Sequence, residues 1–185
     1  ISTSHAVAKS VRVASSTPHL GYCFTPMRYV WDHVDTYLGR GLRRALATPI
    51  VSYLRRFDRR TSTPERVQRF VACSKTVAKR IERCYGRDAR VVYPPVDVER
   101  FRPNGKPPED FYLVVAAFVA YKREDLAIDA FRRLAGRRLI VAGDGPGRGR
   151  FAALAPHNVE FLGRVSDDEL ADLYARCKAL IFPGD

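Results

Sequence analysis

The sequence predicts an α/β protein built on parallel sheets, and three observations lead to that fold class. Residues 111–145 read as strand, polar loop, helix, strand and glycine turn, which is the order of a βαβ unit. Apolar runs typical of strands alternate with amphipathic stretches typical of helices along most of the chain. The glycines of this unit follow a strand directly, at the edge where open parallel sheets bind ligands.

The first half of the chain contains short apolar runs bounded by turn residues, which predict strands at 20–24, 69–73 and 91–93. Residues 1–13 are expected to complete a βα element, and 25–32 to form a loop that enters a helix. Helical spacing marks 35–60, where Pro49 should divide or kink the helix because proline lacks the backbone N–H. A further helix is predicted at 75–85, with Ser74 as its cap and Gly86 at its end.

In the second half of the chain, predicted strands and helices alternate more regularly. Buried-strand patterns predict strands at 112–118, 138–142, 159–162 and 179–182. Apolar residues at helical spacing predict helices at 125–134, 147–154 and 167–176, and Ser166 with the acidic residues after it favours the start of the last one.

Prolines divide the two halves. Four of them lie between 95 and 108, and they favour extended backbone over helix. We therefore predict a domain at 1–95, a linker at 96–108 and a second domain at 109–185. Both ends of the sequence are abrupt, so we expect the chain to be a piece of a longer protein, with both domains incomplete.

Charge is distributed unevenly over the 185 residues, whose formal net charge is +12. Residues 1–107 hold 21 Lys and Arg against 8 Asp and Glu, whereas residues 108–185 hold 11 against 12. This asymmetry indicates an anionic partner, which could be a nucleic acid, a membrane surface or a phosphorylated substrate. A solvated basic face is the alternative. The sequence has no run of about 18 apolar residues, so we predict no membrane-spanning helix.

The stretch Arg40–Arg60 concentrates the positive charge, with arginines between apolar residues at helical spacing. Such a helix fits the surface of an anionic bilayer, and equally a helix that docks on its own domain and leaves a basic face in water. Nucleic-acid binding is unlikely on this sequence, because no helix-turn-helix, zinc-finger or RNA-binding signature accompanies the charge.

The four cysteines and four histidines lack the spacing of metal ligands, since no CxxC pair occurs. We therefore expect reduced thiols, a cytoplasmic location and no metal site.

Two loops carry the candidate chemistry. Gly143, Asp144 and Gly145 match neither the GxGxxG nor the GxxxxGK[ST] pattern, but such a turn lets backbone amides approach a phosphate. Lys122 and Arg123 follow a buried strand, where cations could stabilise a departing diphosphate. A surface Lys-Arg pair without function is the alternative for these two residues.

An ordered series of motifs resembles the family 4 retaining glycosyltransferases of the GT-B fold. The segments that resemble the family are 70–74, 77–81, 85–87, 91–101, 113–131, 143–146, 159–163 and 180–184. Residues 22–32 resemble a subset often assigned as mannosyltransferases of bacterial surface polysaccharides.

The resemblance implies two Rossmann-like domains that face a cleft, with the acceptor on the first and a nucleotide-diphosphate sugar on the second. It implies transfer of a hexose with retention, GDP-mannose being the candidate donor, to a lipid-linked or polysaccharide acceptor at the inner face of the membrane, without a metal or cofactor. It further implies roles for particular residues: Lys122, Arg123 and Gly143–Gly145 at the donor diphosphate, Arg164 and Val165 near the base, and Arg28 and Trp31 on the acceptor side.

Two positions depart from the family pattern. Ala117 stands where the family usually has arginine, and Phe24 stands where the subset usually has histidine close to the reacting sugar. The catalytic residue is therefore unknown, and this fragment is not expected to catalyse transfer alone. The alternative function is a non-catalytic relative that binds a nucleotide sugar or carbohydrate.

Overall fold

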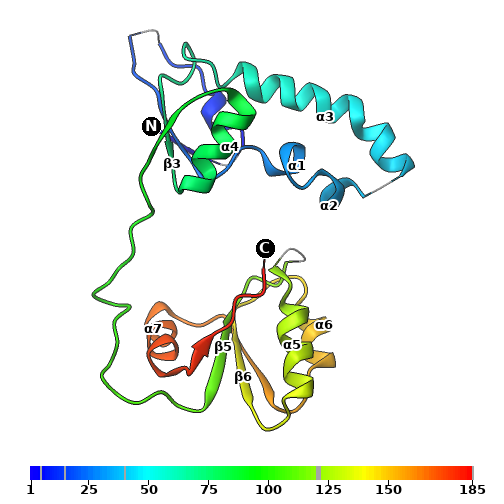
Figure 1. Ribbon diagram of the computed structural model, residues 1–185, viewed down its shortest axis with the longest axis vertical. Coiled ribbons are helices and arrows are strands. Elements are labelled where there is room, and N and C mark those ends of the chain that lie inside the picture. Colours follow the sequence, from blue (N-terminus) through cyan, green and yellow to red (C-terminus); the bar gives the residue numbers. More distant parts are fainter. Residues whose placement is uncertain (5, 15, 40, 120–121, 185) are drawn as a thin grey trace. The chain divides into compact units, whose positions relative to one another are not determined.

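The computed structural model describes residues 1–4, 6–14, 16–39, 41–119 and 122–184. Arg40, the first residue of the predicted basic stretch, lies outside the described residues. The chain forms two compact units, unit 1 at Ile1–Pro95 and unit 2 at Val96–Asp185. Each unit is an α/β fold around a four-stranded parallel sheet, as Figure 1 shows, so the predicted fold class is confirmed.

Unit 1 is built on strands in the order β1-β2-β3-β4, all parallel: β1 (Ser2–Ser4), β2 (Leu20–Cys23), β3 (Arg69–Ala72) and β4 (Ala89–Val91). Helix α4 (Lys75–Tyr85) covers one face, where Val77 and Ile81 pack against Phe70 and Ala72. The Ser74 hydroxyl accepts from the amide of Val77 and caps α4, and Gly86 ends it in the left-handed region, as predicted.

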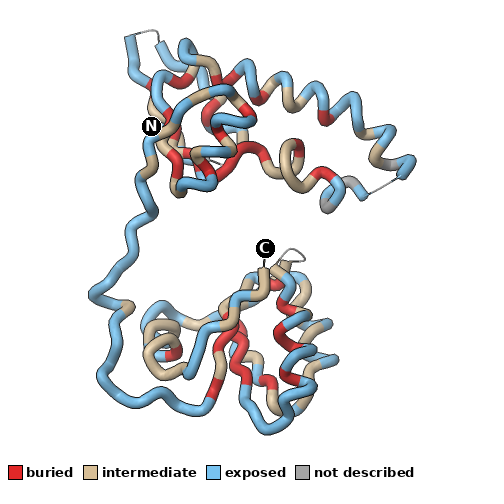
Figure 2. Tube along the Cα trace, in the orientation of Figure 1, coloured by how far each residue is buried: buried red, intermediate tan, exposed pale blue. Residues whose placement is uncertain are grey.

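Three helices follow β2 in unit 1, α1 (Arg28–Trp31), α2 (Val34–Leu38) and α3 (Leu42–Arg60), and α3 holds most of the basic stretch. They share a small apolar cluster, and Figure 2 shows that most of α3 outside this contact is exposed. Of the two outcomes predicted for Pro49, division of the helix is wrong, because α3 runs through Pro49 as one helix. Its ring is exposed, and the helix loses one hydrogen bond there. The break falls at Gly39 and Gly41, which both have positive φ.

A buried carboxylate near the end of α3 ties these elements together. Asp58 is fully buried and pairs with the ammonium of Lys9, which follows β1 in the short 3-10 helix η1 (Ala8–Ser10). The Asp58 carboxylate also accepts from Trp31 Nε1 at 2.8 Å and from the Tyr85 hydroxyl at 2.8 Å. Burial, together with the Asp58 charge, raises the pKa of Tyr85, so the phenol stays a hydrogen-bond donor.

Unit 2 is built on strands in the order β7-β6-β5-β8, again all parallel: β5 (Phe111–Val115), β6 (Arg138–Ala142), β7 (Val159–Gly163) and β8 (Ala179–Leu180). Helices α5 (Glu124–Arg133) and α6 (Arg148–Leu154) cover one face of this sheet, and α7 (Asp167–Arg176) covers the other (Figure 1). Both faces are therefore buried, as open parallel sheets require.

Three strands differ from the sequence prediction by two residues or more: β4, β5 and β8, of which β8 ends at Leu180 rather than at 182. β5 ends at Val115 rather than 118, because Phe118 turns into the left-handed region and packs its ring against Phe151 and Phe161. β4 lies at 89–91 rather than 91–93, because the prolines after Tyr93 lack the N–H groups that would continue the ladder.

The predicted linker, 96–108, contains no helix or strand. Part of it is held against α7, since Arg100 pairs with Asp167 at 3.1 Å and the Phe101 ring lies edge-on to Tyr174. In the described ranges, no helix is both long and apolar enough to cross a membrane.

Asp58→Ala tests the buried network of unit 1. Removing this carboxylate leaves the Lys9 ammonium buried without its partner, which should lower the free energy of unfolding by about 3–5 kcal/mol. The exposed pair of Arg44 with Asp35 serves as the control, and Asp35→Ala should cost less than about 1 kcal/mol. Urea denaturation followed by circular dichroism measures both values, and equal losses would contradict the assigned role.

Candidate functional site

The carboxyl edge of the unit 2 sheet gathers the residues that the sequence analysis singled out. Because the four strands are parallel, the loops after β5, β6, β7 and β8 leave the sheet at the same edge. These loops contain Lys122 and Arg123, then Gly143–Gly145, then Arg164 and Val165, and finally residues 181–184. The topology thus places the predicted diphosphate and base residues at one edge of one sheet.

Close backbone contacts shape this edge. A Cβ atom on Gly143 would lie 1.9 Å from the carbonyl oxygen of Ala116, and one on Gly145 would lie 2.0 Å from that of Ala117. The amide of Gly143 donates to the Gly163 carbonyl at 2.6 Å, and Asp144 Oδ1 accepts from the Gly145 amide at 2.8 Å. The loop after β6 is therefore held on both sides, and its two outer glycines leave no room for a side chain.

Lys122 and Arg123 differ in their surroundings. The Lys122 ammonium lies 4.6 Å from the ring centroid of Phe182, which follows β8. Arg123 adopts left-handed backbone, and its guanidinium pairs with the Asp125 carboxylate at 3.1 Å. Its hydrogen bond holds the pKa of Asp125 below the ordinary value, so the pair stays charged at neutral pH.

A residue that the sequence analysis missed, Arg148 of α6, lies against the end of β7, where the next loop begins. Arg164 is exposed, whereas Val165 is half-buried against the core beneath α7. The guanidinium of Arg148 lies against Gly163, with atoms 3.5–3.9 Å from where a Cβ would stand. Its Nε is buried, and within the described part of the chain it donates to no acceptor. Its position directly after the glycine turn was the only sequence signal for it.

The carboxyl edge of unit 1 presents aromatic surface. The Phe24 side chain is 47% exposed, and its ring lies edge-on to Tyr22 at 5.5 Å between centroids. The Cys73 thiol donates to the Phe24 carbonyl at 3.3 Å. Burial raises the pKa of the neighbouring Cys23 thiol to about 12. Neither Phe24 nor the protonated Cys23 can act as a base at neutral pH.

The two predicted acceptor residues lie on α1. Arg28 is half-buried, and Trp31 packs in the cluster that α1 shares with α3. Besides its hydrogen bond to Asp58, the Trp31 ring has the guanidinium groups of Arg55 and Arg59 at 5.2 and 4.9 Å from its centroid. The indole is thus engaged within unit 1, and its contact with an acceptor stays a prediction.

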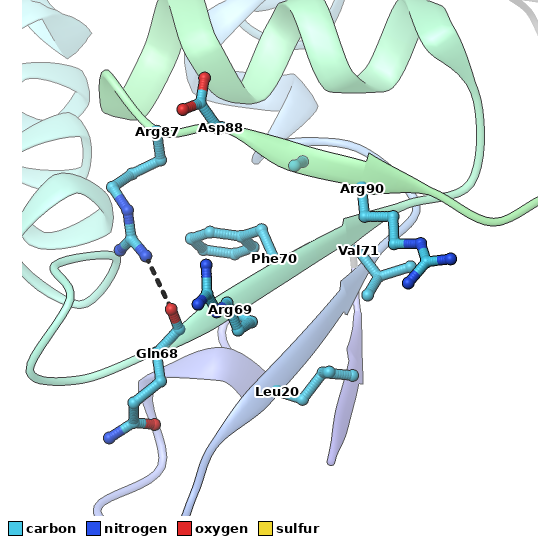
Figure 3. A pocket seen from close by; sticks show the side chains of 9 residues that line it. Leu20, Gln68, Arg69, Phe70, Val71, Arg87, Asp88 and Arg90 are labelled. Atoms are coloured by element: carbon cyan, nitrogen blue, oxygen red, sulfur yellow. Dashed lines mark hydrogen bonds between the residues drawn. The ribbon is translucent and has the colours of Figure 1, made fainter.

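Two cavities lie away from these edges. One of about 660 Å³ opens at the amino ends of β2, β3 and β4 (Figure 3), and one of about 670 Å³ lies between residues 96–103 and α7. Across the described residues, no group of His, Cys, Asp and Glu side chains is placed to hold a metal ion.

Comparison with known proteins finds a family match for part of the chain. Residues 96–185 match the family described as glycosyl transferases group 1. The chain is similar to AviGT4, a glycosyltransferase involved in avilamycin A biosynthesis, with 28% identity and a TM-score of 0.50, over 60% of this chain and 34% of that one. The sequence matches no curated protein significantly.

Two further similarities concern the fold. A variant of TarM from S. aureus, in complex with fondaparinux, α-GlcNAc-glycerol and UDP, has 12% identity and a TM-score of 0.60, over 91% of this chain and 32% of that one. Alr3699/HepE from Anabaena, in complex with UDP, has 16% identity and a TM-score of 0.59, over 90% of this chain and 53% of that one. The chain therefore spans from about a third to about half of the length of these proteins.

Gly143→Ala tests the close approach of the loops. The added methyl would meet the Ala116 carbonyl on a backbone with φ of +124°, so the free energy of unfolding should fall by about 2–5 kcal/mol. Gly149→Ala in α6 is the control, because nothing lies within 4 Å of its added Cβ. It should stabilise unit 2 by roughly 0.5–1 kcal/mol. Urea denaturation measures both, and a neutral Gly143→Ala would refute the contact.

Proposed function

We propose that this chain is part of a glycosyltransferase that binds a nucleotide-diphosphate sugar at the carboxyl edge of unit 2. One observation carries the proposal: the Lys122 loop and the Gly143–Gly145 turn leave the same edge of a parallel sheet, one with an ammonium group and the other with bare backbone. The match of residues 96–185 to group 1 glycosyl transferases supports it.

Each part of this edge has a chemical role in the proposal. As the bond from the sugar to the diphosphate breaks, negative charge grows on the leaving oxygens. The Lys122 ammonium stabilises that negative charge. The Arg123 guanidinium, which pairs with Asp125, adds to this stabilisation. Gly143 and Gly145 let the backbone approach the phosphates more closely than any side chain would permit. The base lies toward Arg164 and Val165.

The finer features of the reaction belong to the same proposal. The donor sugar is a hexose, with GDP-mannose as the first candidate, and transfer proceeds with retention. The acceptor hydroxyl attacks from the face that the diphosphate leaves, without a metal. The acceptor is a saccharide or a lipid-linked saccharide that binds unit 1 near Phe24, Arg28 and Trp31.

A second candidate function is binding of a nucleotide sugar without transfer. The nature of Phe24 favours it, because an exposed hydrocarbon ring can neither accept nor donate a proton. Ala117, whose carbonyl contacts the glycine turn, likewise places no charge at the donor edge. In this alternative the donor binds unit 2 normally and turnover is absent.

The proposal also includes a peripheral location at the inner face of the membrane. On α3, Leu42, Leu46, Ile50 and Tyr53 are 63–76% exposed, and their spacing places them on one side of the helix. Arg56 and Arg60 continue the same side and are exposed. An apolar stripe beside arginines fits a helix that lies in the interface of an anionic bilayer.

Lys122→Gln tests the donor site. The substitution keeps a long polar side chain and removes its positive charge, so the Kd for the preferred nucleoside diphosphate should rise about tenfold or more. Isothermal titration with UDP and GDP measures it, and Lys79→Gln on α4 provides a charge-matched control that should bind normally. Equal affinities for the two variants would contradict the proposed site.

Transfer itself is tested with the longer protein that contains this sequence and a panel of nucleotide sugars. Product from any donor, lost in Lys122→Gln, supports the enzyme. Donor binding without transfer or hydrolysis supports the second candidate, and no donor binding would overturn both.

Leu46→Glu with Ile50→Glu tests the membrane surface on α3. Two carboxylates in the stripe should weaken binding to vesicles of phosphatidylglycerol and phosphatidylcholine at least about tenfold, since each must leave the apolar interface. Leu126→Glu, on an exposed leucine of α5, is the control and should bind like the original protein. Vesicle co-sedimentation reports the binding. No binding by the original protein, or equal binding by all variants, would refute the surface.

A further inference from the structure

We infer that unit 1 holds a second ligand site, a pocket for a sugar phosphate at the amino edge of its sheet. The pocket has a volume of about 660 Å³, which is within the range of small-molecule sites. It is lined by the first residues of three strands, Leu20, Arg69 and Ala89, and by the residues beside them. It therefore lies at the end of the strands opposite Phe24.

Three arginines give this pocket a positive charge (Figure 3). Arg87 and Arg90 lie on opposite sides of the opening, with Arg69 and Phe70 between them. Within the part of the chain that the structure describes, none of the three guanidinium groups forms an ion pair. Asp88 is the one acidic residue of the lining, so the lining carries a net charge of +2.

Hydrogen bonds within unit 1 hold one of the three arginines in place, and the other two are exposed to a ligand. The Arg87 guanidinium donates to the carbonyl oxygens of Ser62 at 2.8 Å, Val67 at 3.0 Å and Gln68 at 3.2 Å (Figure 3), and it lies over the Phe70 ring at 5.4 Å. Arg69 and Arg90 are exposed and donate to no acceptor in the described ranges. A fixed cation flanked by two adaptable ones suits a doubly charged oxyanion, because arginine binds phosphate oxygens in pairs.

The polar groups of the lining extend the argument from a phosphate to a phosphorylated sugar. The Gln68 Oε1 atom accepts from the His19 amide at 2.6 Å, and its side chain points away from the arginines (Figure 3), so Gln68 faces them with its backbone carbonyl. The Asp88 carboxylate would repel an oxyanion but accepts hydrogen bonds from hydroxyl groups. The lining thus offers donors for phosphate oxygens together with one acceptor for a sugar hydroxyl.

The site is separate from the donor edge proposed above, since every lining residue belongs to unit 1. β3 has 4 residues, so the Cα atoms at its two ends are roughly 10 Å apart. A phosphorylated saccharide in this pocket would therefore occupy a different place from an acceptor beside Phe24.

Titration of the 185-residue chain with glucose 1-phosphate and with inorganic phosphate tests the inference, using NMR of the arginine Nε–Hε resonances. Arg69→Gln with Arg90→Gln should raise the Kd of glucose 1-phosphate at least about tenfold. Arg12→Gln with Arg56→Gln removes two exposed arginines elsewhere in unit 1 and is the charge-matched control. Lys122→Gln separates this pocket from the donor edge, and it should leave the binding unchanged.

Binding that only the Arg69 and Arg90 variant loses supports the pocket, whether or not UDP and GDP bind unit 2. Tighter binding of glucose 1-phosphate than of inorganic phosphate supports recognition of the sugar, and equal binding reduces the ligand to the oxyanion alone. The inference is overturned if neither glucose 1-phosphate nor inorganic phosphate shows saturable binding. It is also overturned if the two double-arginine variants weaken binding equally, or if only Lys122→Gln weakens it. Unfolding midpoints confirm that each variant is folded.

Discussion

The candidate site depends on how closely two loops of unit 2 approach each other. The carbonyl oxygens of Ala116 and Ala117 occupy the places where side chains on Gly143 and Gly145 would stand. This contact is possible because Phe118 leaves the strand in the left-handed region and buries its ring under the same loops. The edge therefore presents bare backbone, with the Lys122 ammonium on one of its loops, and our proposal assigns this combination of amides and positive charge to a diphosphate.

The elements of unit 1 are joined by a buried charged group, the carboxylate of Asp58. Asp58 collects hydrogen bonds from η1, α1 and α4, and this places Trp31 inside the unit beside two arginines. The exposed side of α3 and the arginines at the amino edge of the sheet are the two surfaces of unit 1 that we propose bind partners. The excess positive charge of the first half is therefore divided between a structural network and two separate surfaces.

The fold could be predicted because its signals are local. Strand β6 and helix α7 lie where the apolar periodicity and the Ser166 cap placed them. The errors have different causes. Helix α3 continues through Pro49 because an exposed turn tolerates one missing hydrogen bond. Strand β5 ends early because the Phe118 ring packs against Phe151 and Phe161. The sequence motifs indicated the donor edge, but they could not reveal Arg148 beside Gly163 or the arginine pocket, since both depend on contacts between distant segments.

The most direct test is a crystal structure of the longer protein with the nucleoside diphosphate that it binds best. We expect phosphate oxygens within about 3 Å of Lys122 Nζ and of backbone amides in the Gly143–Gly145 turn. A diphosphate bound elsewhere, with the Lys122 ammonium still over the Phe182 ring and the glycine turn empty, would contradict the account.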